Sequence, residues 1–219
     1  PDCFMVADSY LTTHLRRNST QLSKDESDFV LTVFFDLVYE VRVAINRHFA
    51  NQDIYLIADM PDGSYQTETL ARKNAESMLV HGAEVVKIEA SQIEHFKIIE
   101  QLSANGICVI AHIGYTPQTG INRIYGDTYD EALQIFSMAR QARDCGASAL
   151  VVERVGELIN TLLCVNRKDS IPIYSVFSGV SQYGGQSLNV WDSVIRPPFK
   201  ARFFPPTAAI ENSEFPNLY

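Results

Sequence analysis

Several features are scarce in this chain of 219 residues, and each absence excludes a class of protein. No apolar run approaches the roughly 20 residues of a membrane-spanning helix, and no basic-then-apolar secretory signal opens the chain. Basic residues are outnumbered, giving a net charge of -8, which argues against nonspecific binding to nucleic acid or anionic membranes. Phosphate-binding loops of the GxGxxG or Walker type are missing as well.

Cysteine is also scarce, with four residues at positions 3, 108, 145 and 164 and no CxxC pair. Cys3 and Cys108 lie inside strand-like runs, which predicts buried free thiols rather than disulfides. Free thiols favour the cytoplasm as the compartment. What the chain does have is 46% hydrophobic residues, enough at this length for one domain with a sizeable core.

Several short apolar runs end in a single acid or histidine. Their last residues are Asp8, Asp59, Glu89, His112 and Glu153. Short runs rich in Val and Ile, separated by helix-length segments, are typical of buried parallel strands. The sequence predicts strands at 3–8, 54–58, 84–89, 107–112, 148–153, 171–176 and 187–191. Because parallel strands send their C-terminal ends to one face, these polar residues should gather at one rim.

A repeated unit of helix, glycine and short strand indicates the fold class. Helices are expected at 25–47, 67–81, 93–104 and 129–145, and Gly82, Gly106 and Gly146 follow the last three. A strand follows each of these glycines almost at once. This repetition favours a (β/α)8 barrel of the TIM type, whose sites draw residues from many strand ends. A doubly wound sheet is the alternative, although it usually carries a glycine-rich phosphate loop.

Only seven of the eight strands of such a barrel can be found. The missing strand and its helix would precede Pro1, so either they are absent from this chain or the barrel is incomplete. We expect residues 1–193 to form the barrel. Residues 194–219, rich in Pro and aromatic residues, are expected to be a tail packed on it rather than a second domain.

The three acids Asp8, Asp59 and Glu89 suit a hard cation. Carboxylate oxygens at one rim would fit Mg²⁺, which takes one or two carboxylates and keeps water for a substrate. Each acid could instead cap the helix that follows its strand. We favour the metal for the set, because like charges at one rim are costly without a cation.

Lys87, His112 and Glu153 have both chemical and structural interpretations. Lys87 should share a strand face with Glu89, where it could attract an anionic substrate or form a structural ion pair. His112 could donate to a substrate carboxylate or oxyanion, or be a core histidine. Glu153 ends the most apolar run, where burial would raise its pKa toward that of a general base. It could also simply pair with Lys87 or Arg154.

Several motifs resemble the 3-methyl-2-oxobutanoate (ketopantoate) hydroxymethyltransferase family, of the phosphoenolpyruvate mutase/isocitrate lyase superfamily. They occur in family order over about residues 5–192. The matching segments are Val6-Ala-Asp-Ser9, Asn18-Ser-Thr20, Leu56-Ile-Ala-Asp-Met-Pro61, Val86-Lys-Ile-Glu89, Ala111-His-Ile-Gly-Tyr-Thr-Pro-Gln118 and Leu150-Val-Val-Glu-Arg-Val155.

The resemblance implies a role for each residue at the rim. The family's metal aspartates fall on Asp8 and Asp59, and the glutamate just outside the metal's own ligands falls on Glu89. The substrate-binding positions fall on the backbone amide of Ser9 and on Lys87 and His112, and the catalytic base falls on Glu153. The implied reaction enolises 3-methyl-2-oxobutanoate and adds it to the one-carbon unit of 5,10-methylenetetrahydrofolate. The resemblance also implies a homo-oligomer.

Departures from the family pattern keep two further functions open. Tyr10, Ser175 and Phe177 replace residues that are usually smaller, Arg154 stands where the family usually has a cysteine, and the first strand is missing. Added side chains near the pocket would reshape it while sparing the metal and the base. One alternative is therefore a superfamily lyase or aldolase that acts on another 2-oxoacid without folate. The other is a catalytically silent homologue, which the retained polar strand ends argue against.

Overall fold

The computed structural model describes residues 2–165, 171–179 and 183–186. Seven strands in these ranges form one parallel sheet in the order β1-β2-β3-β4-β5-β6-β7. The strands are β1 (Cys3–Val6), β2 (Tyr55–Asp59), β3 (Val85–Glu89), β4 (Val109–Gly114), β5 (Ala149–Glu153), β6 (Ile173–Val176) and the two-residue β7 (Gly185–Gln186). A doubly wound sheet reverses its strand order at a switch point, so this consecutive order confirms the barrel prediction.

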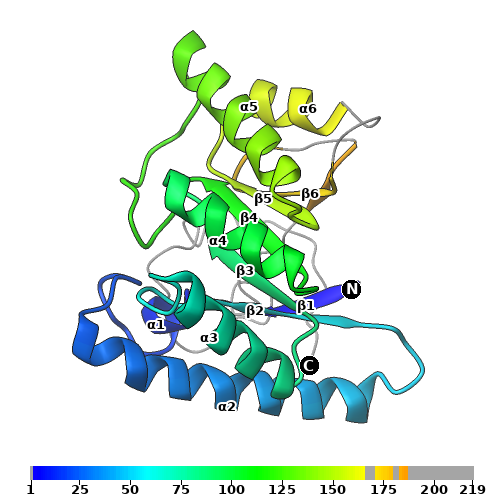
Figure 1. Ribbon diagram of the computed structural model, residues 1–219. Helices are drawn as coiled ribbons and strands as arrows, with labels where there is room; N and C mark the ends of the chain where they lie inside the picture. The colour runs from blue at the N-terminus through cyan, green and yellow to red at the C-terminus, as the bar shows by residue number, and fades with distance from the viewer. Residues whose placement is uncertain (1, 166–170, 180–182, 187–219) are drawn as a thin grey trace.

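Helices follow the strands in alternation and cover the outer face of the curled sheet (Figure 1). They are α1 (Tyr10–Thr13) and α2 (Lys24–His48) after β1, α3 (Glu68–Val80) after β2, α4 (Ile93–Ala104) after β3, α5 (Tyr129–Asp144) after β4 and α6 (Glu157–Val165) after β5. None of the helices in the described ranges has an apolar stretch of the length that crossing a bilayer requires.

The core has two layers, because alternate strand residues point to opposite faces of the sheet. The larger layer lies between sheet and helices and includes Leu56, Val86, Ile88 and Val109. A smaller layer on the inner face holds Ile57, Ile110, Ala149, Val151 and Val176. Within the described residues, β1 pairs with β2 and β7 with β6, so the sheet forms part of a barrel wall.

The predicted elements need modest corrections. Strand β4 runs on to Gly114, beyond the expected end at His112, because Gly114 pairs with Glu153 of β5. The short strand β7, Gly185–Gln186, lies opposite Tyr174 and Ser175 and falls outside the predicted strand ranges. Gly82, Gly106 and Gly146 have φ of +110°, +79° and +83°, as helix-ending glycines should. The expected strand 187–191 and tail 194–219 lie outside the described residues.

The cysteine prediction is half right. All four thiols are free, and Cys164 is buried in α6. Cys108, however, is exposed and Cys3 is only partly buried. Cys108 directly precedes β4, at the end of the sheet away from the polar rim, where the strands leave the core. Both cysteines lie near the start of a strand, and this position makes them more exposed than the apolar character of their runs predicted.

Candidate active site

The five polar strand ends do meet at one rim. Parallel register places Asp59 opposite Lys87, Glu89 opposite His112, and Gly114 opposite Glu153. Asp8 lies two residues beyond β1 and joins them through its amide, which donates to Asp59 Oδ2 at 3.2 Å. The consecutive strand order therefore brings together residues that are far apart in sequence.

Asp59 and Lys87 form a buried ion pair at the centre of this rim. Lys87 Nζ lies 2.9 Å from Asp59 Oδ1, and the side chains are only 5% and 1% exposed. Burial raises the pKa of Asp59 to about 7; Asp8 adds to this rise, whereas Lys87 opposes it. Burial alone would lower the pKa of Lys87, but Asp59, Asp8 and Glu89 outweigh it and raise that pKa. Lys87 is therefore positively charged.

Gln118, in the loop between β4 and α5, connects the acids to one another. Its side-chain Nε2 donates to Asp8 Oδ2 at 2.9 Å and to the Met60 carbonyl at 3.1 Å. Its backbone amide donates to Glu89 Oε2 at 2.9 Å, and the Tyr65 hydroxyl donates to its Oε1. The loop that carries Gln118 is thus fixed directly on the acid cluster.

Lys87, His112 and Glu153 form a row across three strands. Lys87 Nζ lies 3.2 Å from His112 Nδ1, and His112 Nε2 lies 3.3 Å from Glu153 Oε2. Burial lowers the pKa of His112 and the positive charge of Lys87 adds to this, while Glu153 opposes it. A protonated Lys87 donates to Nδ1 of a neutral His112, which leaves the ring proton on Nε2, facing Glu153.

The structural alternatives for these residues can now be judged. The N-caps of α3 and α4 are Thr67 and Gln92, so neither Asp59 nor Glu89 caps the helix after its strand. Lys87 does form an ion pair, with Asp59, and it also faces the rim. Glu153 lies against His112, and its side chain remains 14% exposed. It is therefore the most accessible member of the row.

Ser9 follows Asp8 and is the N-cap of the short helix α1. Its carbonyl accepts hydrogen bonds from the side chains of Thr12 and Thr13. Within the described residues its amide donates to no protein acceptor. That leaves the amide available for a substrate carboxylate, the role that the resemblance implies.

The acid cluster has the chemistry to hold a divalent cation. Burial raises the pKa of Glu89 well above its ordinary value, with Asp8 adding to the effect. Glu89 Oε1 is buried and accepts no hydrogen bond within the described ranges. Three ionised carboxylates and one ammonium would carry a net charge of -2, which a divalent cation would balance.

The number of protein ligands is nevertheless small. Among the described residues, no three His, Cys, Asp or Glu side chains converge as a metal-binding group. A cation here would therefore take few protein ligands and complete its shell with water and substrate, as Mg²⁺ does.

The expectation that Ser175 adds a side chain to the pocket is wrong. Ser175 is fully buried, and its hydroxyl donates to Asn160 Oδ1 in α6 at 2.8 Å. It faces the helix layer, so it does not reshape the inner pocket. Phe177, by contrast, is 55% exposed beyond the end of β6.

Backbone strain marks the strand ends beside this pocket. Arg154 and Phe177 have φ of +50° and +49°, values that cost a non-glycine residue about 1–2 kcal/mol. The backbone of Arg154 is fixed on both sides: its amide donates to the Val176 carbonyl, and its carbonyl accepts from the Tyr125 amide. Strain held in this way often accompanies a functional site.

Comparison with known proteins identifies the family. The profile described as ketopantoate hydroxymethyltransferase matches residues 2–213. The chain belongs to this family. Ketopantoate hydroxymethyltransferases similar to it include the 3-methyl-2-oxobutanoate hydroxymethyltransferase of Pyrococcus abyssi, 37% identical over 158 residues. A probable 3-methyl-2-oxobutanoate hydroxymethyltransferase of Schizosaccharomyces pombe is 31% identical over 177 residues.

The chain spans only part of these ketopantoate hydroxymethyltransferase relatives. The matches cover 68% of this chain and 54% of the archaeal protein, and 77% of this chain and 64% of the yeast protein. Solved structures with the same fold include oxaloacetate acetylhydrolase, with a TM-score of 0.56 and 15% identity over 82% of this chain and 62% of that one. Another is 2,3-dimethylmalate lyase, a member of the PEP mutase/isocitrate lyase superfamily, with a TM-score of 0.54 and 16% identity over 86% and 61%.

Two residues of the site escaped the sequence reasoning. Gln118 ends the motif that begins at Ala111, and membership of that motif was the only signal in the sequence that could have found it. Tyr65 lies in the loop before α3 and carries no pattern of its own. Burial, Glu89, Asp59 and Asp8 all raise the pKa of Tyr65, so it stays protonated and donates to Gln118.

Proposed function

We propose that this chain is a Mg²⁺-dependent ketopantoate hydroxymethyltransferase. It would enolise 3-methyl-2-oxobutanoate and join it to the one-carbon unit of 5,10-methylenetetrahydrofolate. The observation that carries this proposal is the buried group of Asp8, Asp59 and Glu89 beside the row Lys87, His112 and Glu153, in a chain of this family.

The metal would be held by Asp8 and Asp59, with Glu89 contacting it through water. When bound, Mg²⁺ supplies a Lewis acid that polarises the carbonyl of a 2-oxoacid. The chain's own residues orient the substrate: the Ser9 amide is free to meet its carboxylate, and Lys87 places a positive charge within the pocket.

Glu153 would remove the proton from C3 of the ketoacid. It is the only acid of the row and its most exposed member, and His112 Nε2 lies 3.3 Å from its Oε2. Removal of this proton leaves the C3–H electron pair as the enolate. Water would add to the donor's methylene carbon while both of its C–N bonds break and each nitrogen takes a proton, which releases tetrahydrofolate and leaves a one-carbon aldehyde. The enolate would form its C–C bond to that carbon, and the resulting alkoxide would take back the proton held by Glu153.

The experiment is proton NMR of 3-methyl-2-oxobutanoate in D2O with the chain, with and without Mg²⁺. It follows the enolising half-reaction and needs no folate. Loss of the C3 proton signal that depends on Mg²⁺ and disappears in Glu153→Gln would support the proposal. Glu100→Gln is the matched control, because Glu100 is exposed on α4, and it should retain exchange.

The opposite outcomes point to the alternatives. Chain that binds Mg²⁺ but exchanges no C3 proton would refute this substrate and require a panel of other 2-oxoacids. Chain that binds no Mg²⁺ would favour a catalytically silent homologue. Sedimentation velocity would test the proposed homo-oligomer, and cell fractionation would test the proposed cytoplasmic location.

A further inference from the structure

Arg154 directly follows the proposed base at the end of β5, and it is a cation without a partner in the part of the chain that the structure describes. The residue is partly buried, and its buried Nε atom makes no hydrogen bond there. Glu153 does not neutralise it, because that carboxylate lies against His112 instead. A partly buried charge is costly unless an opposite charge pairs with it. The position therefore calls for an anionic ligand.

The backbone around Arg154 is bent and held in that shape. Its φ of +50° lies in the left-handed region, its amide donates to the Val176 carbonyl at 2.9 Å, and its carbonyl accepts from the Tyr125 amide at 2.8 Å. The amide of the next residue, Val155, donates to Ser178 Oγ at 3.0 Å. A regular strand would place residue 154 on the face opposite Glu153. The left-handed bend ends that alternation at the rim.

The phenol of Tyr115 indicates the side on which the guanidinium lies. Burial raises the pKa of Tyr115, Glu153 and Glu89 add to that rise, and the positive charge of Arg154 opposes it. Such charge effects fade over roughly 10 Å in salt solution. One hydroxyl is thus close to the acids of the rim and to Arg154, so the guanidinium lies at the same rim as the proposed base.

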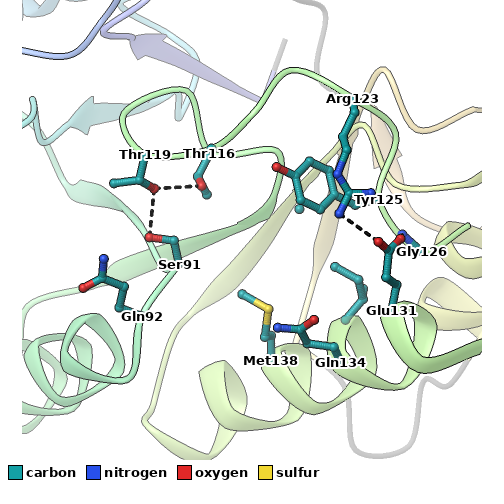
Figure 2. Close-up of a pocket in the computed structure, with 13 residues that line it drawn as sticks. Ser91, Gln92, Thr116, Thr119, Arg123, Tyr125, Gly126, Glu131, Gln134 and Met138 are labelled. Atoms are coloured by element: carbon teal, nitrogen blue, oxygen red, sulfur yellow. Dashed lines mark hydrogen bonds and ion pairs between the residues drawn. The ribbon is translucent and has the colours of Figure 1, made fainter. Parts of the chain in front are cut away.

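A second arginine of this region, Arg123, is already neutralised. It pairs with Glu131 at 2.8 Å and lies 4.2 Å from the centre of the Tyr125 ring (Figure 2). Both side chains line a cavity of about 360 Å³ formed by the loops after β3 and β4 and by α5, and Arg154 does not line it. Of these two arginines, only Arg154 has a charge that the described residues leave unbalanced.

A 2-oxoacid placed for proton removal would extend toward Arg154. Its C1 carboxylate would meet the Ser9 amide and Lys87, and its C3 would face Glu153 on β5. Atoms beyond C3 would then lie past Glu153, where Arg154 follows in the chain. The methyl groups of 3-methyl-2-oxobutanoate cannot pair with a guanidinium, whereas a second carboxylate can accept two parallel hydrogen bonds from it.

We propose that the pocket also accepts a 2-oxodicarboxylate, with Arg154 binding the carboxylate that is remote from the oxo group. This inference rests on the proposed function, because it uses the same enolising site and adds a second class of substrate. Glu153 would take a proton from C3 of the diacid, and the C–H electron pair would become the enolate. In D2O a deuteron from solvent would then return to the same carbon.

Calorimetric binding of 2-oxoglutarate and 2-oxopentanoate, with Mg²⁺ present, tests the role of Arg154. The two acids have the same number of carbons and differ in the remote carboxylate. The parent chain should bind 2-oxoglutarate about tenfold more tightly, the effect of one hydrogen bond to a charged group. Arg154→Met should lose this preference, and Arg154→Lys should recover it in part, because lysine keeps the charge without the planar fork. Arg140→Met is the matched control, since Arg140 is exposed on α5, and it should keep the preference.

Arg154→Gly separates binding from folding. Glycine adopts a φ of +50° without strain, so this variant keeps the bend and removes the guanidinium, and it should lose the preference as well. Equal Kd values for the two acids in the parent chain would overturn the inference, as would a preference that survives in both Arg154→Met and Arg154→Gly.

Proton NMR in D2O distinguishes failure of this inference from failure of the proposed function. The C3 proton signal of 2-oxoglutarate should disappear with the parent chain. A chain that exchanges 3-methyl-2-oxobutanoate but not 2-oxoglutarate would overturn the second activity alone. A chain that prefers 2-oxoglutarate through Arg154 but exchanges neither acid would contradict the enolising function and leave the anion site standing.

Discussion

Replacing Gln118 with methionine should disturb both the stability of the chain and its affinity for Mg²⁺. Gln118 is only 3% exposed, and its side chain makes three hydrogen bonds, to Asp8, the Met60 carbonyl and the Tyr65 hydroxyl. Methionine is close in size and lacks the amide. The hydrogen bond from the backbone amide of residue 118 to Glu89 is unaffected, so the substitution removes only the side-chain hydrogen bonds.

The magnitude follows from the three lost bonds. A hydrogen bond to a charged carboxylate contributes about 1.5–3 kcal/mol and each neutral one about 0.5–1.5 kcal/mol. Their sum is offset in part by the burial of the thioether, and we expect a loss of about 3 kcal/mol in the free energy of unfolding. For a chain of this size that lowers Tm by roughly 6–12 °C.

The metal effect has the same origin. Gln118 fixes one oxygen of Asp8, and removing a partner that orients a metal ligand typically weakens metal binding about 10–100-fold. Urea unfolding in EDTA would give the stability, and calorimetric titration with Mg²⁺ would give the affinity. Gln101→Met, at an exposed position on α4, should stay within about 0.5 kcal/mol of the parent chain.

A double-mutant cycle with Tyr65→Phe isolates the bond between the two side chains. Because Tyr65 donates to Gln118, the two substitutions together should cost less than the sum of their separate effects. If Gln118→Met left both the stability and the Mg²⁺ affinity unchanged, then Gln118 would not be holding Asp8, and the reasoning would be wrong.

Three further predictions concern the acids and the lysine. Glu153→Gln should abolish proton exchange while leaving Mg²⁺ affinity nearly intact, whereas Asp59→Asn should lose metal binding first; full activity in Glu153→Gln would exclude it as the base. Lys87→Met leaves the 1%-exposed Asp59 side chain without its cation and should cost about 3–5 kcal/mol in EDTA, a loss that added Mg²⁺ should reduce. The pKa of Asp59 is raised to about 7, above its unfolded value, so the folded metal-free chain binds the extra proton. Its stability should therefore fall as pH rises from about 4 to 7, and Mg²⁺ affinity should rise over the same range, with both trends weaker in Asp59→Asn.

The meeting of the acids at one rim could be predicted from the sequence because it depends only on strand direction. Once the runs ending at Asp59, Glu89 and Glu153 are parallel strands of one sheet, their last residues must share an edge. The partners on loops could not be predicted in this way. Gln118 lies six residues beyond His112, and its position depends on a loop path that tertiary contacts determine.

Helix α6 was missed for a different reason. Its exposed side carries Leu158 and Leu162, which are 70% and 47% exposed, while Asn160 is fully buried. Leu163 and Cys164 do face the core, but a buried amide together with exposed leucines blurs the apolar stripe by which an amphipathic helix is recognised. Asn160 is buried because its Oδ1 accepts the Ser175 hydroxyl on β6, a contact that no sequence period reveals.

The relative positions of the site residues depend on the pairing of neighbouring strands rather than on closure of the barrel. Asp59, Lys87, His112 and Glu153 come from β2, β3, β4 and β5, and each of these strands is hydrogen-bonded to the next. Asp8 is tied to this series by its own amide. The geometry of the acid cluster is thus set within the first five strands. Substitutions at β6 or β7 should therefore alter stability before they alter Mg²⁺ affinity, whereas substitutions within β2–β5 should alter both together.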